Sequence, residues 1–454
     1  MLTAIAFIIT IGILVTVHEY GHFQVARWCG VKVLKFSVGF GKPIWSKKIG
    51  KDQTEFVIAT IPLGGYVKML GEGLSAADES SQEDASRAFN RQSVQKRMAI
   101  VLAGPLANLL LAIILYFVLF VMGTVGLKPM IGEPIPNSAA ATSGLTAGSI
   151  ISRVDGKLVT TWQEVRWSLL SASLENRKVM IQTKNERGEL FSHQLDLANI
   201  HQGSPNVDIV TQLGLSAYQP SVPARIGEVI ENSPAQAAKL KSGDLIVAVN
   251  QQKIPDWEAF VATIKSKPEQ TLQLDIVRDG QEVKLLITPE SVNENGQRYG
   301  RIGAGFDMPQ ALLDNYLITQ HYGPFDAFVK SLEKTWDTAV FSLKMLVNMV
   351  VGNVSWKGMS GPVTIASYAG QSANMGIKVF LGFLALVSIS IGVLNLLPIP
   401  ILDGGHLMYY MVEFFTGKPA SEFAIAWGQR IGFFILIFTM ALALYNDLSR
   451  LMAG

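Results

Sequence analysis

Two histidines and a glutamate stand close together in the motif HEYGH, as His18, Glu19 and His22. On a helix, His18 and His22 are one turn apart on the same face, so both imidazoles can bind one metal ion while Glu19 reaches a water beside it. This pattern is typical of zinc hydrolases. The stretch before the motif, residues 1–17, carries no charged side chain. Because ionisable groups are costly inside a bilayer and usually serve a function there, the motif predicts a metal site at a membrane.

A catalytic zinc ion normally takes three protein ligands and leaves one position for water, so a third ligand is needed. The best candidate lies in NLLPIPILDGGH, where Pro398 and Pro400 must break a helix and let the chain turn into a cavity. Asp403 follows at once and could complete the site, but His406 is a rival that spacing alone does not exclude. Taken alone, the segment is explained more simply as a turn whose Asp caps the next helix.

The composition places the chain among membrane proteins. Of its 454 residues, 49% are hydrophobic and only 16% are charged, which is too apolar for an ordinary soluble protein and long enough for several domains. A formal net charge of +2 gives a nucleic-acid partner no electrostatic support. Cys29 is the only cysteine, so intramolecular disulfides are excluded and thiol chemistry is not indicated.

Four apolar stretches are long enough to cross a bilayer as helices. The second is the clearest, since it is free of charge. The first could instead be a cleaved signal peptide, but it lacks a basic start, and cleavage would have to spare the HEYGH motif. The predicted spans are roughly residues 1–26, 98–122, 379–397 and 424–445.

The loop between the first two spans is rich in basic residues, with Lys96 and Arg97 directly before the second span. By the positive-inside rule this loop is cytoplasmic. The N-terminus and the long central segment, residues 126 to about 375, are then expected outside, and HEYGH lies toward the cytoplasmic face. Further basic residues of the loop are Arg27, Lys32, Lys35, Lys42, Lys47, Lys48, Lys51 and Lys68.

The central segment contains an internal repeat with an offset of 95 residues, which indicates two copies of one small domain. Each copy predicts a strand, a short helix, a glycine turn and an apolar strand. The matched positions are Ile131, Gly132, Glu133, Ile135, Asn137, Ser138, Leu145, Gly148, Ile151, Val154 and Trp162 in the first copy, and Ile226, Gly227, Glu228, Ile230, Asn232, Ser233, Leu240, Gly243, Ile246, Val249 and Trp257 in the second.

This order of elements resembles a circularly permuted PDZ domain, as in bacterial envelope proteases. Such domains add a peptide to a sheet edge and can capture its terminal carboxylate. Here PMIGE and ARIGE replace the expected glycine-rich carboxylate loop. A steric filter or spacer is therefore an equal alternative to peptide capture, and the PDZ ligand is unknown.

In the cytoplasmic loop, residues 42–49 and 54–61 flank a turn at residues 50–53 and predict a β-hairpin. Strands this close to a membrane site suggest an edge that pairs with substrate. Nearer the C-terminus, the spacing of Phe328, Val329, Leu332, Trp336, Val340, Leu343 and Val347 predicts an amphipathic helix over residues 325–350. It could lie on the membrane surface, but we expect its apolar face to pack under the second repeat.

The motifs HEYGH, PLGGYVKM, GPLAN and NLLPIPILDGGH, together with tandem PDZ-like repeats, resemble the site-2 protease family of intramembrane zinc metalloproteases over essentially the whole chain. The resemblance implies that His18, His22 and Asp403 bind one zinc ion and that Glu19 is the general base. It also implies that Asn395 contacts substrate near the metal, with Asn108, which closes the GxxxN motif of the second span, as a further substrate-binding residue. The alternative for both is a buried Asn that is satisfied by a neighbouring helix.

The expected activity is peptide-bond hydrolysis within the transmembrane helix of a single-span protein. The resemblance implies a pre-trimmed anti-sigma factor of an envelope stress response as substrate, with remnant signal peptides as possible others, in a bacterial inner membrane with periplasmic PDZ-like domains. The alternative is a non-catalytic zinc-containing scaffold that binds partners through the repeats, although a structural zinc site would usually have four protein ligands. A metal transporter is a weaker option, since the helices lack further paired polar residues.

The sequence thus predicts a polytopic α-helical membrane protein with four transmembrane helices, a membrane-associated β-hairpin region and two tandem α+β PDZ-like domains. Its expected parts are an N-terminal membrane part at residues 1–126, a first PDZ-like domain at 127–220, a second at 221–310, an amphipathic helical connector at 311–375 and a C-terminal membrane part at 376–454.

Overall fold

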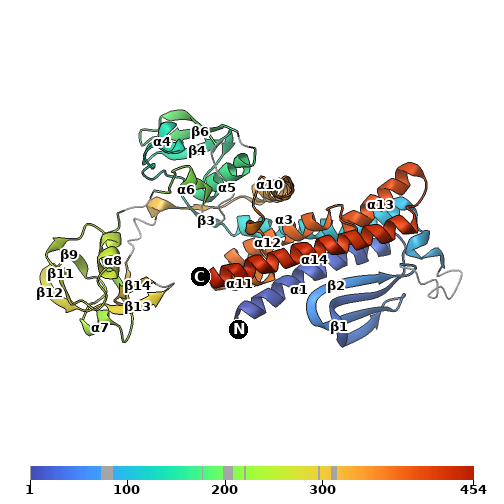
Figure 1. The fold of residues 1–454 in the computed structure, drawn as a ribbon, viewed down its shortest axis with the longest axis horizontal. Helices are drawn as coiled ribbons and strands as arrows, with labels where there is room; N and C mark the ends of the chain where they lie inside the picture. The colour runs from blue at the N-terminus through green and yellow to red at the C-terminus, as the bar shows by residue number, and fades with distance from the viewer. Residues whose placement is uncertain are drawn as a thin grey trace. The chain divides into compact units, whose positions relative to one another are not determined.

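The computed structural model describes residues 2–72, 85–175, 177–197, 208–218, 221–294, 297–307 and 314–453. The chain divides into two compact units, coloured along the sequence in Figure 1. The first, which we call the membrane unit, takes in Met1–Thr124 and Gln320–Ala453. The second, the repeat unit, takes in Val125–Ile200 and Val207–Thr319.

Four helices of the membrane unit are long and apolar enough to cross a bilayer, and each overlaps one predicted span. The second of them packs against the first and the third, and its small side chains such as Ala112 let the helices approach closely. Around Ala112 lie Leu14 and Leu384, both fully or almost fully buried. The four helices are α1 (Leu2–Trp28), α3 (Val94–Val121), α12 (Ile377–Asn395) and α14 (Glu422–Ala453).

Among the described residues, this unit also contains the shorter or amphipathic helices α10 (Pro324–Val351), α11 (Pro362–Asn374) and α13 (Asp403–Thr416). The predicted amphipathic helix is α10, and it packs against α3 and α12. The packing of its apolar face under the second repeat stays a prediction. Its large apolar side chains, such as Trp336, are exposed, whereas the small side chains are buried because they allow close helix contact. The buried positions are Ala327, Ser331, Thr335 and Thr338.

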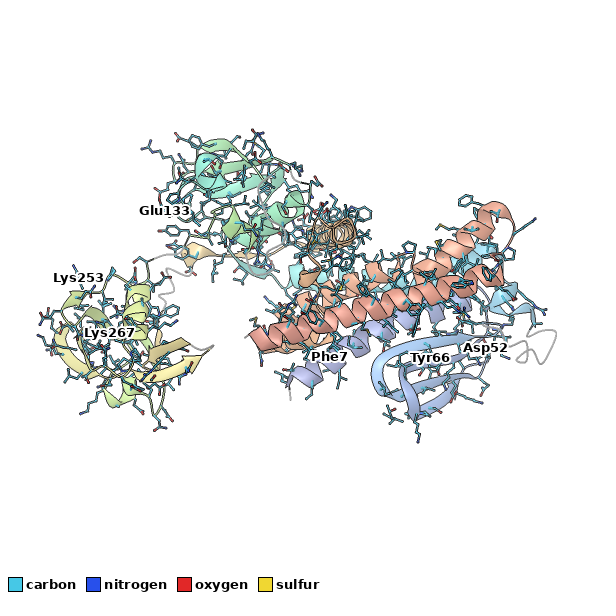
Figure 2. The ribbon with its side chains drawn as sticks, viewed as in Figure 1. Phe7, Asp52, Tyr66, Glu133, Lys253 and Lys267 are labelled. Carbon is cyan, nitrogen blue, oxygen red and sulfur yellow. The ribbon has the colours of Figure 1, made fainter. Side chains whose placement is uncertain are left out.

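The predicted hairpin is formed by β1 (Val33–Ile49) and β2 (Thr54–Met69). Its turn passes through Gly50 at φ 79°, a conformation that glycine adopts without strain. Arg87 holds the same turn through two hydrogen bonds of 2.7 Å to the carboxylate of Asp52, and this pairing lowers the pKa of Asp52. Asp52 in the turn and Tyr66 on β2 are labelled in Figure 2.

Both strands run further than predicted, and the pairing register folds the hairpin over on itself. Residues 35–38 pair with residues 55–58 and also with residues 65–68, while residues 45–48 pair with the other side of 55–58. The result is a sheet of four short segments. Within the described chain, residues 65–68 pair on one side only, so they form a free edge of this sheet.

The repeat unit contains two α+β copies that share the order helix, two strands, helix, two strands, and residues matched in sequence lie in their two cores. Ile131, Ile151 and Val154 are buried in the first, as are their equivalents in the second. The sheet order is β5-β4-β6-β7 in one copy and β10-β9-β11-β12 in the other. Glu133 of the first copy and Lys253 and Lys267 of the second are labelled in Figure 2.

The elements of the first copy are α4 (Ala139–Thr142), β4 (Ile150–Val154), β5 (Lys157–Leu158), α5 (Trp162–Ser173), β6 (Val179–Lys184), β7 (Leu190–Leu195) and α6 (Ile209–Gln212). Those of the second are β8 (Ile226–Val229), α7 (Pro234–Ala237), β9 (Leu245–Val249), β10 (Gln252–Lys253), α8 (Trp257–Lys265), β11 (Leu272–Arg278), β12 (Gln281–Ile287), β13 (Glu290–Glu294), β14 (Gln297–Arg301) and β15 (Ala304–Phe306). The strands β3 (Thr124–Leu127) and β16 (Leu317–Gln320), at the two ends of the central segment, pair with each other.

The ARIGE segment is not a loop but runs into the paired strand β8, which lies beside β15. A glycine with positive φ occupies the same structural position in each copy: Gly214 in the first, at φ 73°, and Gly303 in the second, at φ 72°. They are equivalent, because each accepts a backbone hydrogen bond from a matched residue, Ile135 or Ile230. The sequence comparison missed them because they lie about 90 residues apart instead of 95.

One ion pair distinguishes the second copy. The carboxylate of Asp244 is 1% exposed and pairs with Arg278 at 2.6 Å; the equivalent residue in the first copy is Ser149. Burial would raise the pKa of Asp244, but the hydrogen bonds from Arg278 and from the Lys241 amide outweigh burial and lower the pKa. The charged pair therefore stabilises the copy fully when the pH is above about 3.9, the pKa of Asp in an unfolded chain. This stability is lost as the pH falls through the lower pKa that Asp244 has in the folded protein.

We expect Asp244→Asn to destabilise the second copy by about 3 kcal/mol, near the low end for a broken buried pair because Arg278 stays partly in water. Its stability should also depend less on pH below about 4 than that of the wild type. Hydrogen exchange of β9 and β11 in the full chain measures both effects, with Ser149→Ala as the matched control. Equal protection of wild type and Asp244→Asn would contradict this account.

Candidate metal centre

His18 and His22 lie one turn apart on α1, as their spacing predicts, and their rings meet edge to face with centroids 4.8 Å apart. The two Nε2 atoms are 3.2 Å from each other. Asp403, the first residue of α13, brings its Oδ2 atom to 3.2 Å from Nε2 of His18 and 3.5 Å from Nε2 of His22. Residues more than 380 positions apart in the sequence thus place three donor atoms at one point.

The three donor atoms form a nearly equilateral triangle. Its sides of 3.2, 3.2 and 3.5 Å match the distance of about 3.3 Å between ligands of a tetrahedral zinc ion with bonds of about 2.0 Å. The Oδ2 atom of Asp403 is buried and has no hydrogen-bond partner in the described chain. A buried carboxylate oxygen without a donor is costly unless it binds a cation. The arrangement therefore fits a metal site with three protein ligands and an open fourth position.

The other ring nitrogens of the two histidines are held by α3. Nδ1 of His22 lies 2.8 Å from the carbonyl oxygen of Ile100. A carbonyl can only accept a hydrogen bond, so Nδ1 carries the proton and Nε2 presents its lone pair toward Asp403. Nδ1 of His18 lies 3.3 Å from the side-chain amide of Asn108. Contacts of this kind fix the orientation of metal-binding histidines.

Glycines make room for the close approach of the helices. A Cβ atom on Gly104 of α3 would overlap the imidazole of His22 and lie 2.8 Å from Cε1 of His18. A Cβ atom on Gly21 would lie 2.8 Å from Cβ of Ala107 and overlap the α3 backbone. On the other side of the site, Gly404 and Gly405 pack against backbone carbonyls of the preceding Pro-containing turn. Sequence analysis did not anticipate the roles of Gly21 and Gly104.

A cavity of about 450 Å³ opens beside the three donor atoms. Glu19 lines it together with the free sheet edge, represented by Gly65, Tyr66 and Val67. Gly65 permits this proximity, since a Cβ atom there would lie 2.9 Å from Cγ of Glu19. His406 also lines the cavity but does not belong to the cluster of donor atoms. Asp403, rather than its rival, is thus the residue that the fold places with the two histidines.

Several cavity residues were not anticipated from the sequence. Burial raises the pKa of Glu72, and a hydrogen bond from the Met69 amide only partly opposes this effect. Arg97 pairs with both carboxylate oxygens of Glu413, at 3.1 and 2.7 Å, and its guanidinium lies 4.9 Å from the ring centre of Tyr410. No local motif marks Arg97, Tyr410 and Glu413, because they meet only through the packing of α3 on α13.

The two asparagines take different places. Asn395 is the last residue of α12, is partly buried, and is not among the described residues that line the cavity. Asn108 is fully buried in α3 and contacts His18 instead of the cavity. The structure thus gives Asn108 a partner other than the substrate expected from the sequence.

The HExxH pair lies on α1, a helix that can cross a bilayer, and the Asp403 carboxylate and a cavity lie beside it. This combination is typical of a membrane protein with a hydrolase-type metal centre. Residues 6–439 match peptidase family M50. The regulator of sigma-E protease of Escherichia coli strain K12 is 39% identical over 448 residues, 98% of each chain, and that of Salmonella typhimurium strain LT2 is 40% identical over the same share. A putative zinc metalloprotease of Ralstonia nicotianae is 42% identical over 467 residues, 99% of each chain.

The chain therefore belongs to peptidase family M50, the site-2 proteases, and the resemblance inferred from its motifs is confirmed.

Proposed function

We propose that this protein is an intramembrane metalloprotease that binds one zinc ion through His18, His22 and Asp403 and cleaves peptide bonds within transmembrane segments. The observation that carries the proposal is the triangle of three donor atoms beside a cavity that Glu19 also lines. Family membership and the names of relatives as zinc metalloproteases support it. A closed structural zinc site would need a fourth protein ligand, and the described residues cluster only three.

When bound, zinc would activate a water molecule and polarise the scissile carbonyl. Glu19 then acts as general base, taking the proton from the attacking water and passing it to the leaving amine. His22 is held for ligation by the Ile100 carbonyl, and the glycines around the site keep the helices close enough for Asp403 to reach both imidazoles.

A helical substrate must unwind before its peptide bonds can be cut, which exposes backbone groups that need new partners. Residues 65–67 of the free edge line the cavity beside Glu19. An unwound substrate strand that pairs with this edge would regain its backbone hydrogen bonds next to the metal. Asn395, at the end of α12, is a candidate for a further substrate contact.

We further propose that the natural substrate is a pre-trimmed, membrane-spanning anti-sigma factor, with remnant signal peptides as other substrates. The relatives named as regulators of sigma-E protease support this substrate class. The basic loop between the first two spans supports an orientation in which the active site faces the cytoplasm and the repeats lie in the periplasm of an inner membrane. There the PDZ-like repeats would exclude proteins with bulky ectodomains.

The proposed activity is tested with the purified chain in detergent and a synthetic single-span peptide. We expect about one zinc ion per chain, cleavage inside the apolar segment, loss of cleavage with a chelator and its return with added zinc. A scaffold would bind zinc without cleaving, and a transporter would move zinc across vesicles. Either of those results, with no cleavage, would exclude the protease.

The filter role of the repeats makes a separate prediction. Deletion of residues 131–289 should allow cleavage of a substrate that still carries its folded ectodomain, while cleavage of the trimmed form continues. Gel analysis of both substrates in cells measures the change in selectivity. Unchanged selectivity with normal membrane insertion would count against exclusion by size.

A further inference from the structure

The amide of Asn108 is fully buried, yet within the described chain it has one hydrogen-bond partner, Nδ1 of His18, which lies 3.3 Å from its Nδ2 atom. Its Oδ1 atom is buried and has no partner. The Asn108 backbone is fixed as well, since its carbonyl accepts a hydrogen bond of 2.7 Å from Ser388 on α12. A buried amide oxygen that lacks a hydrogen bond is uncommon in folded proteins, and this one belongs to a side chain that contacts a candidate metal ligand.

The choice of the ring nitrogen of His18 that carries the proton can explain this arrangement. An NH₂ group can only donate, so with Nδ2 toward the ring, Nδ1 of His18 must accept and the proton must sit on Nε2. That proton then points into the triangle, where Asp403 Oδ2 is 3.2 Å away. In this arrangement the proton occupies the position from which the Nε2 lone pair would bind a metal.

A half-turn of the Asn108 amide reverses this arrangement. It puts Oδ1, an acceptor, against Nδ1 of His18, so that Nδ1 carries the proton and Nε2 presents its lone pair. His22 already has this tautomer, fixed by the Ile100 carbonyl, which cannot turn into a donor. Of the two histidines, His18 alone thus has a partner able to serve both tautomers.

We propose that Asn108 is a positioning residue that sets the tautomer of His18, its amide turning oxygen toward Nδ1 when the metal is loaded. This inference rests on the proposed zinc site and assigns Asn108 a role other than contact with substrate. Partners of this kind typically change metal affinity by about 10- to 100-fold when removed.

The test compares zinc affinity, measured by competition with a chromophoric chelator, in the full chain and three variants. Asn108→Leu keeps the volume but removes the acceptor, so zinc should bind about 10- to 100-fold more weakly. Asn108→Asp keeps an acceptor at Nδ1 and should stay within a few-fold of wild type. Ser388→Ala, which loosens the same helix contact without touching His18, is the matched control and should bind zinc as wild type does.

Cleavage at saturating zinc separates positioning from substrate contact. If Asn108 acts through His18, Asn108→Leu should regain most of its kcat with KM unchanged, whereas a substrate contact would raise KM. Equal zinc affinity of Asn108→Leu and wild type, or equal weakening in Ser388→Ala, would overturn the inference. Wild-type protein that binds no zinc would instead overturn the proposed function on which it rests.

Discussion

Glu19→Gln should abolish cleavage of a transmembrane peptide while leaving zinc in place. Glu19 lines the cavity beside the three donor atoms but is not one of them, so the neutral amide should not disturb the ligands. What is lost is the only step that needs its negative charge, removal of a proton from the attacking water. Because a positioned general base contributes about 10²- to 10⁴-fold, we expect kcat to fall by roughly 10³-fold. Single-turnover cleavage and metal analysis of the same sample measure both quantities.

The comparison variant is Glu72→Gln, which changes another carboxylate that lines the same cavity. Glu72 accepts a hydrogen bond from the Met69 amide, and the side-chain oxygen of Gln can accept the same bond. We therefore expect kcat to fall by less than tenfold. If Glu19→Gln retained wild-type cleavage, Glu19 would not be the base. If it lost zinc together with activity, the residue would serve the ligands instead of the chemistry.

The helical part of the metal site could be predicted because it depends on local spacing. An i, i+4 pair places His18 and His22 on one face of any helix. The repeat could also be predicted from the sequence, since the matched residues Ile131, Ile151 and Val154 lie in the buried core of the first copy. In these cases the information lies within a few turns or in direct comparison of two segments.

Other features depend on how distant elements pack and therefore left no local signal. The side of α10 that packs could not be read from apolar periodicity, because between apolar helices close contact favours small residues such as Ser331 and Thr335 over large ones. The fold-over of the hairpin, which leaves residues 65–68 as a free edge, follows from a register that no alternation of side chains specifies. The contact of Asn108 with His18 likewise arises only when α3 packs on α1.

The role of Gly104 also depends on the packing of α3 on α1, and we expect its replacement by alanine to have a large effect. Helix propensity alone says that Gly104→Ala should stabilise α3, by up to about 1 kcal/mol. The packing of α3 on α1 predicts destabilisation instead, because the added Cβ atom would overlap the His22 imidazole and lie 2.8 Å from Cε1 of His18. The neighbours cannot yield easily, since Nδ1 of His22 is tied to the Ile100 carbonyl on the same helix.

We therefore expect Gly104→Ala to separate α1 from α3 or rotate both rings, so that the three donor atoms no longer meet. Overpacking of this kind costs about 1–3 kcal/mol, and zinc affinity and cleavage should both fall by roughly 100-fold or more, beyond what loss of one supporting contact produces. Zinc competition, peptide cleavage and thermal unfolding in detergent measure the three effects.

Gly12→Ala is the matched control, because Gly12 lies on α1, where a Cβ atom would meet nothing within 4 Å. It changes glycine to alanine in a helix of the same bundle, and should leave zinc affinity and cleavage as in the wild type while gaining slightly in stability. If Gly104→Ala behaved like Gly12→Ala, the contact between α3 and the two imidazoles would not shape the metal site. If only Gly104→Ala lost zinc, the small size of this residue would be as necessary to the site as its ligands, because it decides how near to α3 the histidines can lie.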